Sequence, residues 1–174
     1  MENNQINQIV MPGNELKDEQ VYRKILGKVV TGVSILTLNE NDELDGLMVS
    51  FVQQIAFNPP MLMISIAKDR PIIAKIKKVI FATLNILAKD NHEFFKAFAG
   101  PNLSSQERFG LVNYEKQADY GPILLKALGF INLRLTKSSE AGCHEVLFFT
   151  VDGGQIFASN GEPMVHIRND GLKY

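Results

Sequence analysis

The sequence predicts a mainly β protein, a barrel or sandwich with a few small helices over its open ends. The first observation is a series of short β-branched and apolar runs separated by Gly, Pro, Asn and Asp turn signals. The second is Met61–Ala67, an apolar run bounded by Pro59-Pro60 and by charged residues, which is too short for an ordinary helix and indicates a strand buried on both faces. The third is that helical patterns are few and short, as in all-β folds with capped ends.

The N-terminal region predicts a flexible arm followed by one amphipathic helix. Residues 1–13 begin with a polar stretch rich in Asn and Gln, so we expect an arm outside the folded domain. Asn14 or Asp18 is a suitable helix cap. The apolar residues that follow recur at i, i+3, i+4 and i+7 and form one stripe, which consists of Tyr22, Ile25, Leu26 and Val29.

Residues 29–55 predict a β-hairpin. Val29–Leu38 and Leu44–Ile55 are both rich in β-branched and apolar residues, and the polar turn Asn39–Glu43 separates them. Gly32 and Gly46 lie inside or beside these strands, where a glycine indicates the close approach of backbone or ligand.

A candidate phosphate site follows the buried strand. Lys68, Asp69, Arg70 and Pro71 lead into a predicted helix over Ile72–Lys78. Proline favours the first helical turn, which leaves Asp69 or Arg70 as the cap. A helix N-terminus offers free N–H groups and partial positive charge, and Lys68 and Arg70 lie beside it. The alternative is a solvated basic turn without a ligand.

The rest of the chain alternates strands with two short helices. The predicted elements are a strand at Phe81–Leu87, a helix capped by Asp90 that carries Phe94, Phe95 and Phe98, a short helix opened by the capping box Ser104–Glu107, strands at Phe130–Thr136 and His144–Val151, a turn at Asp152–Gly154, a return strand at Gln155–Ala158, and Val165–Arg168 after a turn at Ser159–Gly161.

Asn85 stands in the middle of the apolar strand Phe81–Leu87. A buried side-chain amide needs hydrogen-bond partners. A bound ligand could supply them, and the alternative is the neighbouring backbone.

Composition indicates one globular domain and excludes several functions. The chain has 174 residues, 45 % of them hydrophobic, and a formal net charge of −1, so no basic excess indicates nucleic acid or a membrane surface. No apolar run reaches the roughly 18 residues of a membrane span. A single cysteine fits a reducing compartment, and the polar N-terminus does not resemble a signal peptide, so we expect a cytoplasmic protein.

The common catalytic motifs are absent from the sequence. It contains no Rossmann fingerprint, P-loop, zincin motif or nucleophile elbow. Its three histidines, His92, His144 and His166, do not have metal-ligand spacing, so we expect no metal site. Cys143 and His144 are adjacent, and if both lie in a strand their side chains point to opposite faces and do not form a pair.

The motifs taken together resemble the FMN-binding split-barrel flavin reductase-like family. The resemblance covers about residues 20–174 and implies one such domain over residues 14–174. It rests on the order and spacing of Gly46–Ser50, Phe57–Pro60, Ala67–Arg70, Asn85–Leu87, Phe98–Gly100, Arg108-Phe109, Gly121–Leu124, Ala127-Leu128, Gly142–His144 and the closing His166–Arg168 and Gly171–Tyr174. The run Phe51–Pro60 and the His-x-Arg ending resemble the flavin reductase domain at the C-terminus of cyanobacterial flavodiiron proteins.

The resemblance implies a six-stranded antiparallel split β-barrel with a few short helices. It implies a homodimer that binds FMN near the subunit interface, with FAD as a second candidate flavin and NADH or NADPH as hydride donor. Reduced flavin would pass electrons to O₂, to a partner oxygenase or to another redox protein. No nucleic acid, membrane or metal is implied.

The resemblance also implies the site residues. Met48, Val49, Ser50 and Phe51 would edge the flavin ring, Gln53 and Gln54 would lie at its ribityl side, Ala67, Lys68, Asp69 and Arg70 would form the phosphate region, Asn85 would hydrogen-bond the flavin, and His144 would lie over the ring as the catalytic residue, with His166 and Tyr174 as weaker candidates.

The sequence departs from the family pattern at four positions. Family members often have Ser where this chain has Phe51, Ser or Thr where it has Gln53 and Gln54, and an acidic residue where it has Cys143. These departures bear on the reductase rate, the choice of nucleotide and the tightness of flavin binding. A second hypothesis is an FMN-binding electron-transfer module without its own NAD(P)H reductase activity. A third hypothesis is a related split barrel that binds haem or another cofactor.

Overall fold

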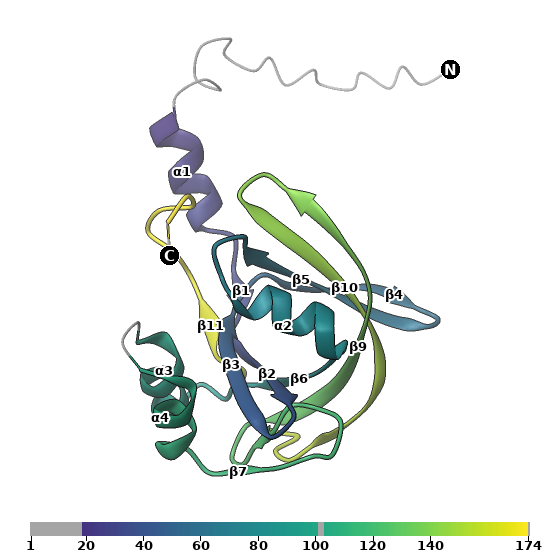
Figure 1. The fold of residues 1–174 in the computed structure, drawn as a ribbon. Helices are drawn as coiled ribbons and strands as arrows, with labels where there is room; N and C mark the ends of the chain where they lie inside the picture. Colours follow the sequence, from purple (N-terminus) through teal and green to yellow (C-terminus); the bar gives the residue numbers. More distant parts are fainter. Residues whose placement is uncertain (1–18, 101–102, 174) are drawn as a thin grey trace, which may run out of the picture. The chain divides into compact units, whose positions relative to one another are not determined.

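The structure is a computed structural model that describes residues 19–100 and 103–173, and these divide into two compact units (Figure 1). One unit combines the N-terminal region up to Val30 with Ile167–Tyr174, and the other is Thr31–His166. The helices are α1 (Glu19–Gly27), α2 (Ile72–Val79), α3 (His92–Ala99) and α4 (Ser105–Gly110). The strands are β1 (Thr31–Gly32), β2 (Ser34–Glu40), β3 (Glu43–Val49), β4 (Val52–Phe57), β5 (Pro60–Ala67), β6 (Phe81–Ile86), β7 (Tyr114–Glu115), β8 (Ile123–Leu124), β9 (Gly129–Ala141), β10 (His144–Ile156) and β11 (Val165–His166).

The larger unit is a split barrel. Its main sheet is antiparallel and has the strand order β3-β2-β6-β9-β10-β5-β4. The two edge strands, β3 and β4, are joined by only Ser50 and Phe51, so the sheet must curl until its edges meet. Strand β3 also contacts β5, next to the opposite edge, which closes the curl. The mainly β fold class predicted from the sequence is therefore confirmed.

The barrel interior forms one apolar cluster, and α2 adds Ile72, Ile73 and Ile76 to it. A second cluster packs α3 and α4 on the outside of β2 and β3. Gly46 lies at this second contact, where an added methyl group would come within 2.6 Å of the Phe98 ring. The close neighbour of Gly46 is thus an aromatic side chain rather than the predicted backbone or ligand, and an added methyl group at Gly32 would meet nothing within 4 Å, so the predicted close approach of backbone is wrong for Gly32.

The sheet has seven strands rather than the predicted six. The predicted strand Leu44–Ile55 is divided at Ser50 and Phe51 into β3 and β4. Strand β3 pairs with β2 and β4 pairs with β5, so the two halves belong to opposite edges. Apolar residues continue from β3 through Ser50 and Phe51 into β4, because both strands are partly buried. The sequence pattern therefore does not indicate that the pairing partner changes from β2 to β5.

The predicted turn at Asp152–Gly154 is wrong. Strand β10 continues through these residues to Ile156, paired with β9, and the register shifts between Val151 and Gly153. Such a β-bulge bends a strand without ending it. A methyl group at Gly154 would lie 2.4 Å from the carbonyl oxygen of Phe130, so this glycine serves close pairing with β9.

The predicted helices are present, with two shifted caps. The N-cap of α2 is Pro71 rather than Asp69 or Arg70, and the N-cap of α3 is Asn91 rather than Asp90. The capping box of α4 is confirmed, because the Ser104 hydroxyl accepts from the Glu107 N–H while the Glu107 carboxylate accepts from the Ser104 N–H.

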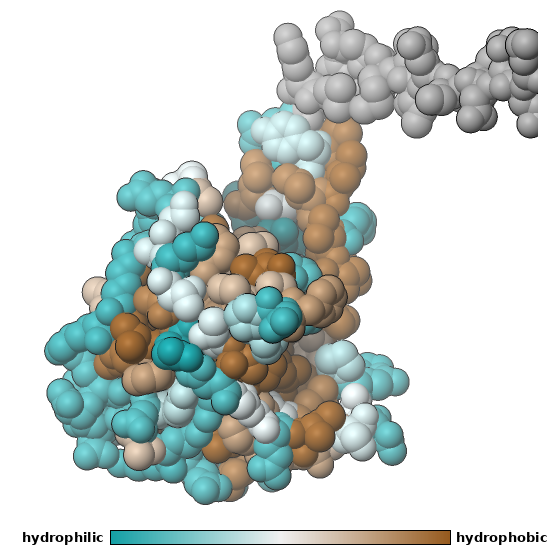
Figure 2. All heavy atoms as spheres, turned by 90° about the vertical axis from the view of Figure 1, so that its right-hand side faces the viewer, coloured by the Kyte–Doolittle hydropathy of each residue, from teal (hydrophilic) through white to brown (hydrophobic). Residues whose placement is uncertain are grey.

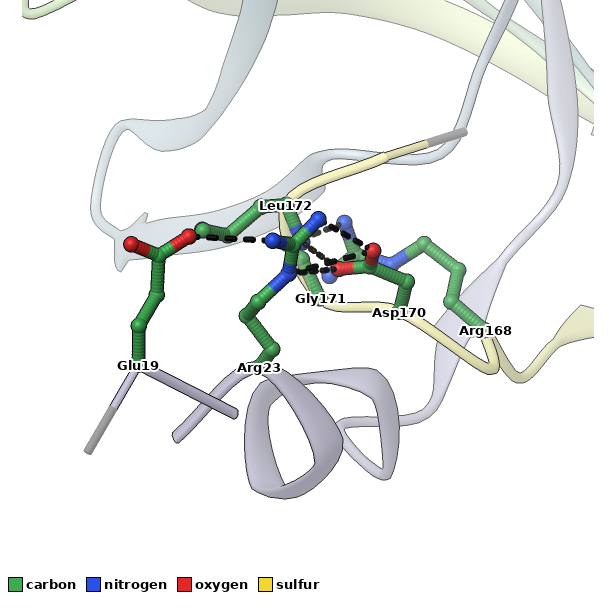
Figure 3. Close-up of polar contacts among 6 residues, drawn as sticks. All are labelled: Glu19, Arg23, Arg168, Asp170, Gly171 and Leu172. Atoms are coloured by element: carbon green, nitrogen blue, oxygen red, sulfur yellow. Dashed lines mark hydrogen bonds and ion pairs between the residues drawn. The ribbon is translucent and has the colours of Figure 1, made fainter. Parts of the chain in front are cut away.

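The smaller unit is α1 clamped by the C-terminal tail (Figure 3). The Arg23 guanidinium donates to Asp170, with 2.6 Å from Nη2 to Oδ2, and its Nη1 lies 3.0 Å from Oε1 of Glu19. The Gly171 N–H donates to the Arg23 carbonyl at 2.7 Å. A methyl group at Gly171 would lie 2.2 Å from Cβ of Leu26, so the tail passes too close to α1 for a larger residue.

The predicted apolar stripe is largely exposed, and its last member, Val29, lies beyond the end of α1 at Gly27. Tyr22, Ile25, Leu26 and Val29 are 40 to 62 % exposed, and Leu172 of the tail is 52 % exposed. Figure 2 shows apolar side chains gathered along one side of this helix. No helix among the described residues is long and apolar enough to cross a membrane. The predicted arm, residues 1–13, and the caps Asn14 and Asp18 lie outside the described residues.

Candidate functional site

Three chain segments meet at the end of β5. The Ser65 N–H donates to the Phe51 carbonyl at 3.0 Å, which fixes the link between the two edge strands beside β5. His144, the first residue of β10, is the ladder partner of Ala67, the last residue of β5. The rings of Phe51 and His144 lie 5.7 Å apart, centroid to centroid, and are tilted by 47°. The fold therefore brings together three of the predicted site residues that are far apart in sequence.

Cys143 and His144 come together, because the condition for their separation, that both lie in a strand, is not met. Cys143 Sγ lies 3.1 Å from His144 Nδ1. Cys143 is in the turn before β10, after Gly142 with a φ of +57°. The alternation of side chains that separates neighbours holds only inside a strand.

The basic residues after β5 lie against the β9–β10 turn. The Lys68 N–H donates to the Cys143 carbonyl at 3.0 Å, and Lys68 Nζ lies 2.8 Å from Oε2 of Glu140. The Arg70 N–H donates to the Ala67 carbonyl at 3.0 Å, which closes the turn. The Arg70 guanidinium lies 4.0 Å from the Asp69 carboxylate, measured from Nε to Oδ1.

A third carboxylate, that of Glu145, lies beside this basic turn. Glu145 is the ladder partner of Glu140, and its Oε1 lies 2.6 Å from Lys77 Nζ. Hydrogen bonds from Lys77 and Ser138, together with the charge of Lys68, hold the pKa of the Glu145 carboxyl below its usual range. Glu145 is therefore an anion at neutral pH, with lysine side chains around it.

The other predicted flavin contacts are distributed along β3 and β4. Met48 and Val49 end β3 opposite Ile35 and Ser34 of β2, and Ser50 is 9 % exposed. Their backbone leads directly into Phe51, so they reach the candidate site from one side.

Gln53 and Gln54 are exposed and lead away from that end. They pair with Met63 and Leu62, and their amide groups donate to backbone carbonyls of β4 itself. Because each strand residue advances roughly 3.3 Å, Gln54 is about 10 Å along the strand from Phe51.

Asn85 is fully buried and its side-chain amide has partners within the protein. Its Nδ2 lies 3.2 Å from the Thr37 hydroxyl and 3.3 Å from the Pro122 carbonyl, and its Oδ1 accepts from the Leu124 N–H at 2.8 Å. Of the two alternatives predicted from the sequence for Asn85, a bound ligand or the neighbouring backbone, these hydrogen bonds correspond to the second. The amide holds the segment 122–124 against the sheet.

Glu140 is a charged residue of this site that sequence reasoning missed. The strand containing it was predicted to end at Thr136, whereas β9 continues to Ala141. Its partner Lys68 is 72 positions away in the sequence. Only the order of the strands β9, β10 and β5 in the sheet indicates that the two residues lie close together. Of the two weaker candidates, His166 lies in β11 and pairs with Thr31 of β1, and Tyr174 lies outside the described residues.

A surface hollow of about 790 Å³ lies elsewhere, at the start of α3, and none of the predicted site residues lines it. Its rim includes Lys89, His92, Lys126 and Glu162. Within residues 19–100 and 103–173, no group of three His, Cys, Asp or Glu side chains is placed to hold a metal.

Comparison with known sequences identifies one family. The flavin reductase like domain matches residues 26–171. Diflavin flavoprotein A 1 of Synechocystis sp. is 28 % identical over 152 residues, which are 87 % of this chain and 26 % of that protein. The chain therefore spans about a quarter of the length of this curated relative.

Solved structures share the fold. The nitrilotriacetate monooxygenase component B homolog of Mycobacterium thermoresistibile superposes with a TM-score of 0.79 at 20 % identity, covering 89 % of this chain and 86 % of that chain. The flavin reductase HpaC, complexed with NADP⁺, gives a TM-score of 0.75 at 25 % identity and covers 86 % and 94 %. These likenesses confirm the predicted split barrel.

Proposed function

Because the chain belongs to the flavin reductase-like family, as its motifs predicted, we propose that it binds FMN and transfers hydride to it from NADH or NADPH. FAD is the second candidate flavin. The observation that carries the proposal is the meeting of Phe51 and His144 beside the basic turn that follows β5. An aromatic ring pair next to two cations suits a ligand that combines a planar ring with a phosphate.

The donor set at the start of α2 fits a phosphate. Lys68 and Arg70 have side chains that are 39 % and 57 % exposed, so both are accessible to a ligand. The N-cap of α2, Pro71, makes no side-chain hydrogen bond to the helix. A helix start without a side-chain cap, next to two cations, is a favourable place for an anion. Asp69 and Ala67 would shape this turn.

The ring of the flavin would lie against the link between β3 and β4. Met48, Val49 and Ser50 would border it through their backbone, and Gln53 and Gln54 would line the way toward its tail. When bound, a flavin supplies the reversible uptake of a hydride equivalent. His144 would lie over the ring and orient the nicotinamide, held in place by Phe51 and Cys143. Asn85 would act only indirectly, by holding segment 122–124 against the sheet.

Reduction of the bound flavin by NADH or NADPH distinguishes two candidate functions. In the first, reduced flavin passes electrons to O₂, to an oxygenase or to a redox protein. In the second, the chain is an electron-transfer module without its own NAD(P)H activity. The departures from the family pattern at Phe51 and Cys143 support the second function.

We also propose a homodimer. The exposed apolar stripe of α1 supports an interface with a second copy, since exposed apolar patches mark interaction surfaces. Soluble homo-oligomers are most often two-fold dimers. Sedimentation or light scattering reads the state directly.

Equilibrium titration with FMN and with riboflavin, followed by flavin fluorescence, tests the proposed site. The double substitution Lys68→Ala and Arg70→Ala removes both cations of the phosphate seat. It should weaken FMN roughly 10-fold or more and leave riboflavin nearly unchanged, because only FMN carries the phosphate. An equal loss of affinity for FMN and for riboflavin would show that the phosphate does not bind at Lys68 and Arg70.

A further inference from the structure

The residues around the proposed phosphate seat balance one another in charge. Lys68 and Arg70 are two cations, and Glu140 and Asp69, which lie 2.8 Å and 4.0 Å from them, are two anions. Two positive and two negative charges give a net charge of zero. The neighbouring pair of Lys77 and Glu145 adds one charge of each sign and leaves the balance unchanged.

The contact of Glu140 with Lys68 is not required by the fold. Strands β9 and β10 pair over many residues, so their hairpin does not depend on one ion pair near its tip. The Glu140 side chain is 81 % exposed. Moreover, Glu140 stands directly opposite Glu145 in the ladder, and like charges in that arrangement are unfavourable. Lys68 and Lys77 offset this repulsion. We therefore interpret the two carboxylates as groups that set the charge around Lys68 rather than as groups that stabilise the hairpin.

A phosphate that binds at Lys68 and Arg70 encounters a lysine, Lys68, that already forms an ion pair with Glu140. A phosphate monoester carries about −1.5 to −2 charges at neutral pH. To contact Lys68 it must take the place of the Glu140 carboxylate or lie in its repulsive field. Because the pair of Lys68 and Glu140 is solvated, it is weak and exchangeable.

We propose that Glu140 is a specificity-determining residue that competes with the flavin phosphate for Lys68. It thereby lowers the preference of the site for FMN over flavins without a terminal phosphate and favours release of the flavin. This inference rests on the proposed function, because it takes the phosphate to lie at Lys68 and Arg70. It makes the flavin an exchanging ligand rather than a tightly held group.

The test compares the dissociation constants of FMN and riboflavin for the wild-type chain and for Glu140→Gln. Glutamine keeps the size of the side chain and removes its charge. FMN should bind roughly 2- to 5-fold more tightly to the variant, as expected for one exposed ion pair, with riboflavin unchanged. Raising the salt concentration should weaken FMN binding more in the variant, because the seat then carries a net positive charge.

Two controls separate this effect from a general change of surface charge. Asp42→Asn removes another carboxylate that pairs with a lysine, Lys116, at 3.3 Å. Asp42 lies in the turn between β2 and β3, at the other end of β3 from Ser50, so this substitution should leave both dissociation constants unchanged. In a Lys68→Ala background, Glu140→Gln should lose its selective effect, since the two residues act through one contact.

The outcomes are distinguishable. Weaker FMN binding by Glu140→Gln would show that Glu140 braces Lys68 for the ligand, and an equal change for FMN and riboflavin would show that it acts on the ring; either result overturns the inference while the proposed flavin site stands. No selective change would also overturn it. Failure of the wild-type chain to bind either flavin would overturn the proposed function and the inference together.

Discussion

His144 is the residue on which the proposed chemistry depends most. Its ring is fixed from two directions, by Phe51 at 5.7 Å between centroids and by the Cys143 thiol at 3.1 Å. A side chain held in this way can orient a second planar ligand, and misplacement of a reacting group by about 1 Å costs up to about 100-fold in rate.

His144→Ala should therefore slow flavin reduction roughly 10-fold or more, while FMN affinity changes much less. Stopped-flow absorbance under anaerobic conditions measures the first quantity and a flavin titration the second. His92→Ala, at an exposed histidine that begins α3, is the matched control and should change neither. Unaltered reduction kinetics in His144→Ala would exclude this residue from the site.

Residue-level prediction from sequence was limited by contacts outside the local pattern. Asn85 was identified as a buried amide, but only the fold shows that Thr37, Pro122 and Leu124 supply its partners. Cys143 and His144 were expected to point apart only if both lay in a strand, and the turn at Gly142 that places Cys143 outside β10 is not visible in an apolar pattern.

At the scale of elements, the clamp between α1 and the tail predicts sensitivity to acid. Hydrogen bonds donated by the Arg23 guanidinium, together with one donated by the Leu172 N–H, lower the pKa of the Asp170 carboxyl from 3.8 to about 2. A depressed carboxyl pKa means that the folded clamp prefers the ionised form. Its stabilising effect is therefore complete above about pH 4 and is lost as the pH falls toward 2.

Hydrogen exchange of the Gly171 amide, which donates to the Arg23 carbonyl, follows this clamp. Protection should fall as the pH drops from about 4 to about 2, after correction for the intrinsic exchange rate. Asp170→Asn should lower protection at neutral pH and remove the acid dependence. Persistence of the acid dependence in that variant would assign it to another group.

Elements with strong local signals were predicted well. Strand β5 follows from one apolar run between prolines and charges, and α4 follows from its capping box. Only alternate residues of β5 are buried, so the predicted burial on both faces is wrong. The break at Ser50 and the continuation of β10 through Gly153 were missed, because both depend on which strand pairs alongside. Glycine at Gly153 and Gly154 signals a turn or a bulge equally, and the partner strand β9 decides between them.

At the scale of the whole molecule, the family resemblance supplied more of the candidate site residues than local sequence patterns did. The order of motifs indicated the split barrel, and the basic turn after β5 was visible from sequence alone. Glu140 was not, since it reaches Lys68 across the sheet from a part of β9 beyond its predicted end. The distribution of Gln53 and Gln54 along β4, away from Ala67, likewise follows only from strand register.

The measurement that tests the central claim most directly is an anaerobic visible spectrum of the purified chain with FMN, recorded before and after addition of NADH and then NADPH. If the chain is a flavin reductase, the absorbance of the bound flavin will bleach rapidly with at least one nucleotide, which also identifies the donor. Bound flavin that stays oxidised with both nucleotides would contradict the reductase function and favour the electron-transfer module.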